Sequence, residues 1–176
     1  MGRLLVFALV NSSDVFLLLN ARQAVMTDTA VIGLYIFYNV VYAAAAYPAG
    51  RLTDRIGLKR VLVVGVVVFA LVYGGMSVAG NWVILGELFA LYGLYAAATE
   101  GVAKAFISNL AARGETATAI GTYASFQSMV ALAASVGAVL LWSRAGPTVV
   151  FGLAGSVALG VAVYLARWLH PDKVLN

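Results

Sequence analysis

Six long apolar segments, separated by short polar connections, constrain the fold of this chain more than any other feature. We place them at residues 4–19, 30–49, 61–78, 82–103, 117–142 and 148–168. Each is close to the roughly 20 residues that a helix needs to cross about 30 Å of hydrocarbon. Of the 176 residues, 63% are hydrophobic and 10% are charged, whereas a soluble domain carries about 25% charge. The sequence therefore predicts an all-α membrane protein that folds as one bundle over residues 1–176.

Composition also narrows the possible chemistry. The chain has no cysteine, which excludes disulfides and thiolate metal sites, and its one histidine, His170, has no other metal-ligating residues around it. We find neither a glycine-rich phosphate loop nor a hydrolase triad, so we expect no enzyme activity, no cofactor and no metal. The formal net charge of +4 comes from basic residues in the connections. This placement favours a lipid bilayer as the partner, and not nucleic acid.

The basic residues divide unequally between the two sides of the predicted bundle. Nine lie on the side of the termini, and two, Arg22 and Arg144, lie on the other. The nine are Arg3, Arg51, Arg55, Lys59, Arg60, Lys104, Arg113, Arg167 and Lys173. Because short cytoplasmic loops are rich in Lys and Arg, this bias predicts cytoplasmic termini and a protein of the bacterial inner membrane. Trp82, Trp142 and Trp168 fall at segment ends, where interfacial tryptophans are common.

The densest cluster of charge, residues 50–62, reads GRLTDRIGLKRVL and is expected to form the loop between the second and third segments. It resembles the loop signature of the major facilitator superfamily of secondary transporters. The matching residues are Gly50, Leu52, Asp54, Arg55, Gly57, Lys59 and Arg60, and Leu58 departs where a basic residue is usual. The basic residues would also serve as topology determinants in any membrane protein. An acid such as Asp54 is not needed for that role.

The resemblance implies a specific architecture. Members of the family usually have twelve helices, and a solute binds between two six-helix halves, each built from two inverted three-helix repeats. This chain resembles one half, most closely the C-terminal one. It would need a second half, either a different N-terminal half or a second copy of itself. In the family, the acid at Asp54 sits against the start of the fifth helix and holds the cytoplasmic gate closed.

Polar residues inside the segments are the candidate site, because ionisable groups are costly in lipid. The candidates for the solute or proton pathway are Asp14, Asn11, Glu87, Asn39, Gln127, Tyr92 and Tyr95. Asp14 lies near mid-membrane, with Asn11 three residues earlier on the same helical face. A structural hydrogen bond could also explain Asp14, and contact with interfacial water could explain Glu87. Glu100 is expected to pair with Lys104 one turn on.

The distribution of these groups over the segments agrees with the family pattern. The first and fourth segments carry acids, the second and fifth carry amides, and the third and sixth carry neither. In the family, the first and fourth helices line the cavity, the second and fifth flank it, and the third and sixth face lipid. Tyr35, Tyr38 and Tyr42 form a stripe on the second segment, which we interpret mainly as packing.

The leading hypothesis for function is secondary active transport of a small solute by alternating access, coupled to protons through Asp14 or Glu87. A non-transporting membrane scaffold or assembly subunit is the alternative. The predicted cavity helices carry acids, amides and tyrosines, with Lys104 as a cation near one end. This inventory favours a cationic or neutral solute over an anion.

Overall fold

The computed structural model describes residues 15–24, 27–112 and 114–167, and the regular structure within them is entirely helical. The helices are α2 (Val15–Ala24), α3 (Asp28–Ile56), α4 (Leu58–Met76), α5 (Trp82–Leu110), α6 (Thr116–Ala145) and α7 (Pro147–Arg167). The predicted all-α class is therefore confirmed. Five helical spans are long and apolar enough to cross a membrane: Asp28–Ile56, Leu58–Met76, Trp82–Asn109, Thr116–Ala145 and Pro147–Tyr164. The chain is an integral membrane protein.

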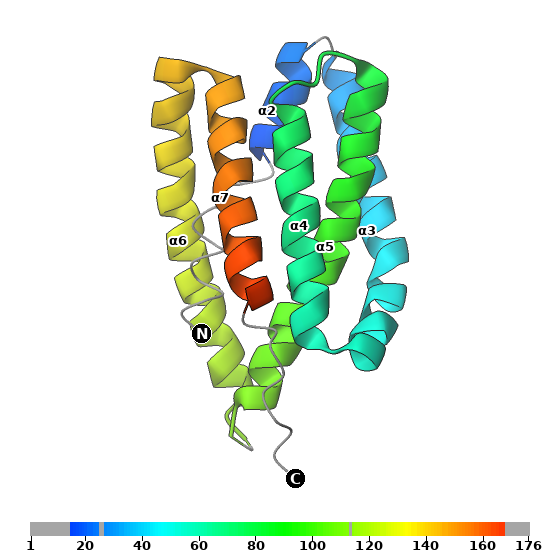
Figure 1. The fold of residues 1–176 in the computed structure, drawn as a ribbon, viewed down its shortest axis with the longest axis vertical. Coiled ribbons are helices and arrows are strands. Elements are labelled where there is room, and N and C mark those ends of the chain that lie inside the picture. The colour runs from blue at the N-terminus through cyan, green and yellow to red at the C-terminus, as the bar shows by residue number, and fades with distance from the viewer. Residues whose placement is uncertain (1–14, 25–26, 113, 168–176) are drawn as a thin grey trace.

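The helices stand side by side as an elongated bundle, with α6 and α3 at its two edges (Figure 1). The closest packing joins α3 to α5, α4 to α5 and α4 to α7. Helix α6 touches α7 and α5 more sparsely, and the described part of α2 packs against α3. Helix α4 thus lies in the centre of the bundle, between α5 and α7.

Aromatic rings connect these central helices. Phe69 and Tyr73 of α4 stack with ring centroids 4.0 Å apart, and Tyr73 lies 5.5 Å from Phe151 of α7. Phe151 in turn meets Trp142 of α6 at 5.8 Å, and Trp142 meets Phe16 of α2 at 5.9 Å. Because the rings of Phe69, Tyr73 and Phe151 have no exposed surface, they set the spacing of the central helices.

Glycines allow the backbones to approach at two of these helix contacts. A Cβ atom at Gly93 of α5 would lie 2.8 Å from the carbonyl oxygen of Tyr38 in α3. A Cβ atom at Gly155 of α7 would lie 3.0 Å from the backbone nitrogen of Gly74 in α4. Small residues at such positions are the usual means of close helix packing in lipid.

The basic stretch expected as a loop is mostly helical. Helix α3 continues to Ile56, α4 begins at Leu58, and Gly57 alone separates them with a φ of 90°. Helices α3 and α5 each extend about two turns beyond the ends predicted at residues 49 and 103. Hydropathy marks where a segment leaves the apolar layer, but a helix can continue into water, so the prediction ended both helices too early.

The polar connection predicted after the first segment also differs. Asn20 belongs to α2 and is 7% exposed. Its side-chain amide donates a 3.2 Å hydrogen bond to the carbonyl oxygen of Met76. The last carbonyls of a helix have no partner within that helix, so Asn20 satisfies one at the end of α4 and ties α2 to it.

Candidate functional site

The residues that the structure describes leave one face of α5 uncovered along most of the helix. We call it the α5 stripe: Ile84, Glu87, Leu91, Leu94, Ala98, Gly101 and Ala105. These residues follow each other at alternating spacings of three and four, so they share one side of the helix. All are exposed except Ala98, which is half-buried. The opposite side of α5 packs against α3 and α4. The fourth membrane segment therefore presents a continuous face to whatever lies outside the described bundle.

Glu87 is the charged member of the α5 stripe. It lies one to two turns into α5, which begins at Trp82 behind the N-cap residue Asn81. Its side chain is exposed and makes no hydrogen bond or ion pair with any residue that the structure describes. The prediction that Glu87 is available to a solute or a proton is consistent with this position, and its role stays a proposal. Asp14 and Asn11, the other candidates for that role near mid-membrane, lie outside the described residues.

Tyr92 and Tyr95 lie elsewhere than we expected. Each is only 3% exposed, and both belong to the buried core. Tyr92 lies 5.5 Å from the ring of Tyr38, and Tyr95 lies 5.1 Å from Phe69. The sequence placed both tyrosines on the fourth segment, but it did not show which side of that helix packs against α3 and α4. In this structure their rings pack α5 against α3 and α4, and they do not line an open face.

The second acid of α5 contacts a neighbouring helix. The Tyr42 hydroxyl of α3 donates to the Glu100 carboxylate across 3.4 Å. At about 100° per residue, Glu100 lies roughly 140° around the helix from Glu87, on the side that meets α3. Sequence reasoning expected Glu100 to pair with Lys104 and did not foresee Tyr42. A spacing rule finds partners within a helix but cannot find one on another helix.

The predicted amide sites on α3 and α6 are partly satisfied within their own helices. The Asn39 amide donates to the Tyr35 carbonyl oxygen across 2.8 Å. On α6, the hydroxyls of Ser125 and Ser128 donate to the carbonyl oxygens of Gly121 and Ala124. Gln127 is half-buried on the inner side of α6. Because a side chain bonded to its own backbone satisfies itself in lipid, none of these bonds requires a solute.

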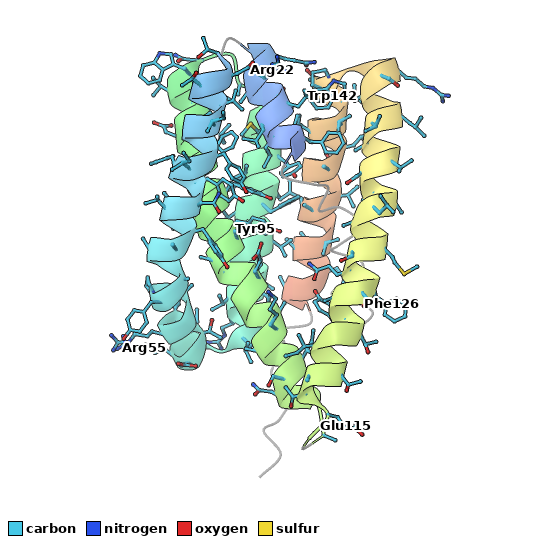
Figure 2. The ribbon with its side chains drawn as sticks, turned by 180° about the vertical axis from the view of Figure 1, so that it is seen from behind. Arg22, Arg55, Tyr95, Glu115, Phe126 and Trp142 are labelled. Carbon is cyan, nitrogen blue, oxygen red and sulfur yellow. The ribbon has the colours of Figure 1, made fainter. Side chains whose placement is uncertain are left out.

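The two ends of the bundle differ in charge. Arg51, Arg55, Lys59 and Arg60 gather around Gly57, and Arg55 and Glu115 lie at the same end of the bundle (Figure 2). Arg22 lies at the opposite end, near the end of α6 that carries Trp142 (Figure 2). There Arg22 forms a 2.9 Å ion pair with Asp28. The basic end is thus the one that carries the α3–α4 and α5–α6 connections.

Asp54 lies at this basic end, exposed in the last turns of α3. It makes no ion pair with any other residue that the structure describes. The guanidinium of Arg51 lies 5.9 Å from the centre of the Tyr47 ring. The matched glycine Gly57 has a left-handed φ, which explains why glycine is needed there. Gly50 is helical and has open space around it.

A bundle of apolar helices with a short basic turn, here between α3 and α4, is the arrangement of the major facilitator superfamily. Residues 3–175 match the sequence model of the Major Facilitator Superfamily, and the chain therefore belongs to this family. Over 158 residues it is 37% identical to a protein of Methanocaldococcus jannaschii named as an MFS-type transporter. That match covers 86% of this chain and 39% of the relative, so the chain spans well under half the length of the protein it resembles.

Proposed function

We propose that the chain forms one six-helix half of a secondary transporter that moves a small solute across the membrane by alternating access. The observation that carries the proposal is the α5 stripe. Within the described bundle, helix α5, which corresponds to the fourth predicted segment, has one continuous uncovered face, and that face holds the carboxylate of Glu87. A carboxylate in a crossing helix normally faces protein or a water-filled cavity, because lipid solvates it poorly.

The edges of the bundle support the need for a second half. In an 18-residue apolar stretch of each helix, 11% of the α3 residues and none of the α6 residues are buried, whereas 50% of the α5 residues are. These edge helices are the second and fifth segments, which flank the cavity in the family. A second six-helix half placed on this side would cover α3 and α6 at its borders and would close the α5 stripe into a cavity.

The pattern of helix contacts supports two inverted three-helix repeats. Exchanging α2 with α5, α3 with α6 and α4 with α7 is the symmetry that such repeats require. Under this exchange the α3–α4 contact becomes α6–α7, and the α2–α3 contact becomes α5–α6, and all four contacts are present. The α3–α5 and α4–α5 contacts would become α6–α2 and α7–α2, which are not among the main contacts of the described part of α2, residues 15–24. The α4–α7 contact maps onto itself. We propose that the two triplets are related in this way.

We further propose that the basic end faces the cytoplasm, in accord with the positive-inside bias. Labelling of a single cysteine introduced near Lys59 in sealed vesicles tests this orientation. Asp54 would hold the cytoplasmic gate closed against the positive end of a helix. Asp54→Asn should leave folding intact and increase labelling of cavity positions from the cytoplasmic side. Unchanged labelling from both sides would exclude the gating role.

Proton coupling through Asp14 or Glu87 completes the proposal, and reconstitution tests it. The chain, alone or with a second half, is placed in proteoliposomes with a pH gradient. Gradient-driven uptake should be abolished by the neutral variant at the coupling site, Asp14→Asn or Glu87→Gln, while solute exchange continues. If both variants retain gradient-driven uptake, neither acid couples transport to protons.

A non-transporting scaffold or assembly subunit is the rival function, because the chain aligns with only 39% of its relative. The two functions differ in what must cover the α5 stripe. Transport requires a second bundle on that face, whereas a scaffold can act as a single bundle. Crosslinking between cysteines placed at Leu94 and on α6 of a second bundle, in native membranes, should therefore trap a two-bundle species. A chain that stays single in the membrane would favour the scaffold.

A further inference from the structure

The chemistry of the α5 stripe defines a class of ligand more narrowly than the transporter proposal does. Apart from Glu87, its members are aliphatic or glycine: Ile84, Leu91, Leu94, Ala98, Gly101 and Ala105. Leu91 and Leu94 are 37% and 46% exposed and follow Glu87 by about one and two turns. A ligand lying along the stripe would therefore meet one negative charge at one end and hydrocarbon over the rest of its length.

The described residues supply no counter-charge for Glu87. On α5 itself the next basic residue is Lys104, which is roughly 25 Å away at 1.5 Å per residue. Arg51, Arg55, Lys59 and Arg60 lie at the opposite end of the bundle. Arg22 lies at the same end as Glu87 but forms its ion pair with Asp28, at 2.9 Å. Arg144, in the last turn of the edge helix α6, lies at this end as well and makes no ion pair with Glu87. A carboxylate exposed on a membrane-spanning helix is poorly solvated by lipid, so a cationic ligand would supply the counter-charge that the described residues lack.

Other ligand classes fit the stripe poorly. An anion would meet the Glu87 carboxylate and no basic group along the stripe. A sugar would lose the water bound to its hydroxyls and find few polar partners there. A divalent metal ion needs several oxygen ligands, whereas the stripe offers one carboxylate. The described part of the chain contains no group of three or more metal-ligating side chains.

We propose that the α5 stripe binds lipophilic organic cations that carry one positive charge, with Glu87 as the counter-charge and Leu91 and Leu94 as the apolar contact surface. This inference rests on the proposed function, because it names the solute class of the same cavity. It also assigns selectivity to particular residues. Glu87 would select for positive charge, and Leu91 and Leu94 would select for an apolar body.

Binding of tetraphenylphosphonium to the full chain in lipid nanodiscs tests the proposal, with protein-free nanodiscs as the blank for partition into lipid. Saturable binding is expected, and Glu87→Gln should weaken it at least about tenfold, the loss that corresponds to removing one charge interaction of about 1.4 kcal/mol. Glu100→Gln is the matched control, since it removes the other acid of α5 from the side facing α3. The affinity of the Glu100→Gln variant for the cation should stay within about twofold of the affinity of the unaltered chain.

Two more measurements separate charge from apolar contact. Tetraphenylborate, an anion of similar shape, should show no saturable binding to the unaltered chain. Leu94→Gln keeps the charge of the stripe and should weaken cation binding by removing apolar contact. The proposal is overturned if the cation fails to bind saturably, if the anion binds as well, or if Glu87→Gln leaves cation affinity unchanged in a chain whose helical content is preserved.

This experiment and the uptake assay can fail separately. Cation binding without uptake, in vesicles that also contain a second half, would disprove alternating access and leave the ligand class intact. Gradient-driven uptake of another solute, without cation binding, would confirm transport and disprove the ligand class.

Discussion

Helices α4 and α6 are almost equally apolar, yet their surroundings are opposite. An 18-residue apolar stretch of α4 has a mean hydropathy of 1.9, and that of α6 has 1.7. Of the residues in these stretches, 39% are buried in α4 and none are buried in α6. In a soluble protein, a helix as apolar as α6 would be buried among other helices. In a membrane, lipid is an equally good surrounding for aliphatic side chains, so hydropathy identifies a crossing helix without showing its neighbours.

Side-chain shape distinguishes the two helices where hydropathy does not. Helix α4 carries two stacked rings, Phe69 and Tyr73, and a glycine, Gly65, at which a Cβ atom would lie 2.5 Å from the Thr99 side chain. Helix α6 directs large flexible side chains outward, with Met129 and Leu132 68% and 67% exposed. Specific packing is therefore concentrated at α4, α5 and α7, and the variants below test this contrast.

Truncating the Phe151 ring should have the largest effect on stability. Phe151 is fully buried between Tyr73 and Trp142, so Phe151→Ala leaves a cavity and should destabilise the fold by about 3 kcal/mol. The matched control is Phe126→Ala on α6, whose ring is 53% exposed and which should change stability by less than about 0.5 kcal/mol. Unfolding in mixed detergent micelles measures both. Equal losses would mean that α6 is packed as specifically as α7.

Adding one methyl group at Gly93 should have the next largest effect. The new Cβ would lie 2.8 Å from the Tyr38 carbonyl oxygen and 3.0 Å from the Val41 Cβ, and a backbone carbonyl cannot move without shifting α3. We expect Gly93→Ala to cost about 1–3 kcal/mol in the same unfolding assay. Gly86→Ala, on the same helix with nothing within 4 Å, should be neutral or slightly stabilising. A neutral Gly93→Ala would show that α3 and α5 do not pack this closely.

Part of the fold and of the candidate site could be predicted from the sequence, and part could not. Five apolar segments and the position of the basic stretch between two of them follow from hydropathy and charge, because both can be seen in the local sequence. The first predicted segment lies mostly outside the described residues, and the helical state of the basic stretch was not predicted. Which side of α5 faces inward does not follow from the sequence, since Tyr92 and Glu87 are both compatible with a cavity helix until α3 and α4 are placed. The Asn20–Met76 and Tyr42–Glu100 bonds join helices far apart in sequence, and no local pattern encodes them.

Removing the Asn20 amide tests a buried polar contact against one on the edge helix α3. Asn20→Ala deprives the Met76 carbonyl of its donor inside the bundle and should cost about 1 kcal/mol. Asn39→Ala removes a bond to the carbonyl of its own helix at Tyr35 and should have a smaller effect, within about 0.5 kcal/mol. If Asn39→Ala proves the more damaging change, the amide of α3 contacts something outside the described bundle.

The smallest effect is expected at the bond between α3 and α5. Tyr42→Phe removes the hydroxyl that donates to Glu100 across 3.4 Å, a long bond at a partly exposed site, so the loss should be about 0.5 kcal/mol or less. Tyr35→Phe, on the exposed face of α3, is the control and should cause no loss. Combining Tyr42→Phe with Glu100→Leu tests the contact itself, because each change removes one partner of the same bond and together they should cost no more than one. Strictly additive losses would show that Tyr42 and Glu100 act independently and that α3 is joined to α5 by the Gly93 contact and the aromatic core alone.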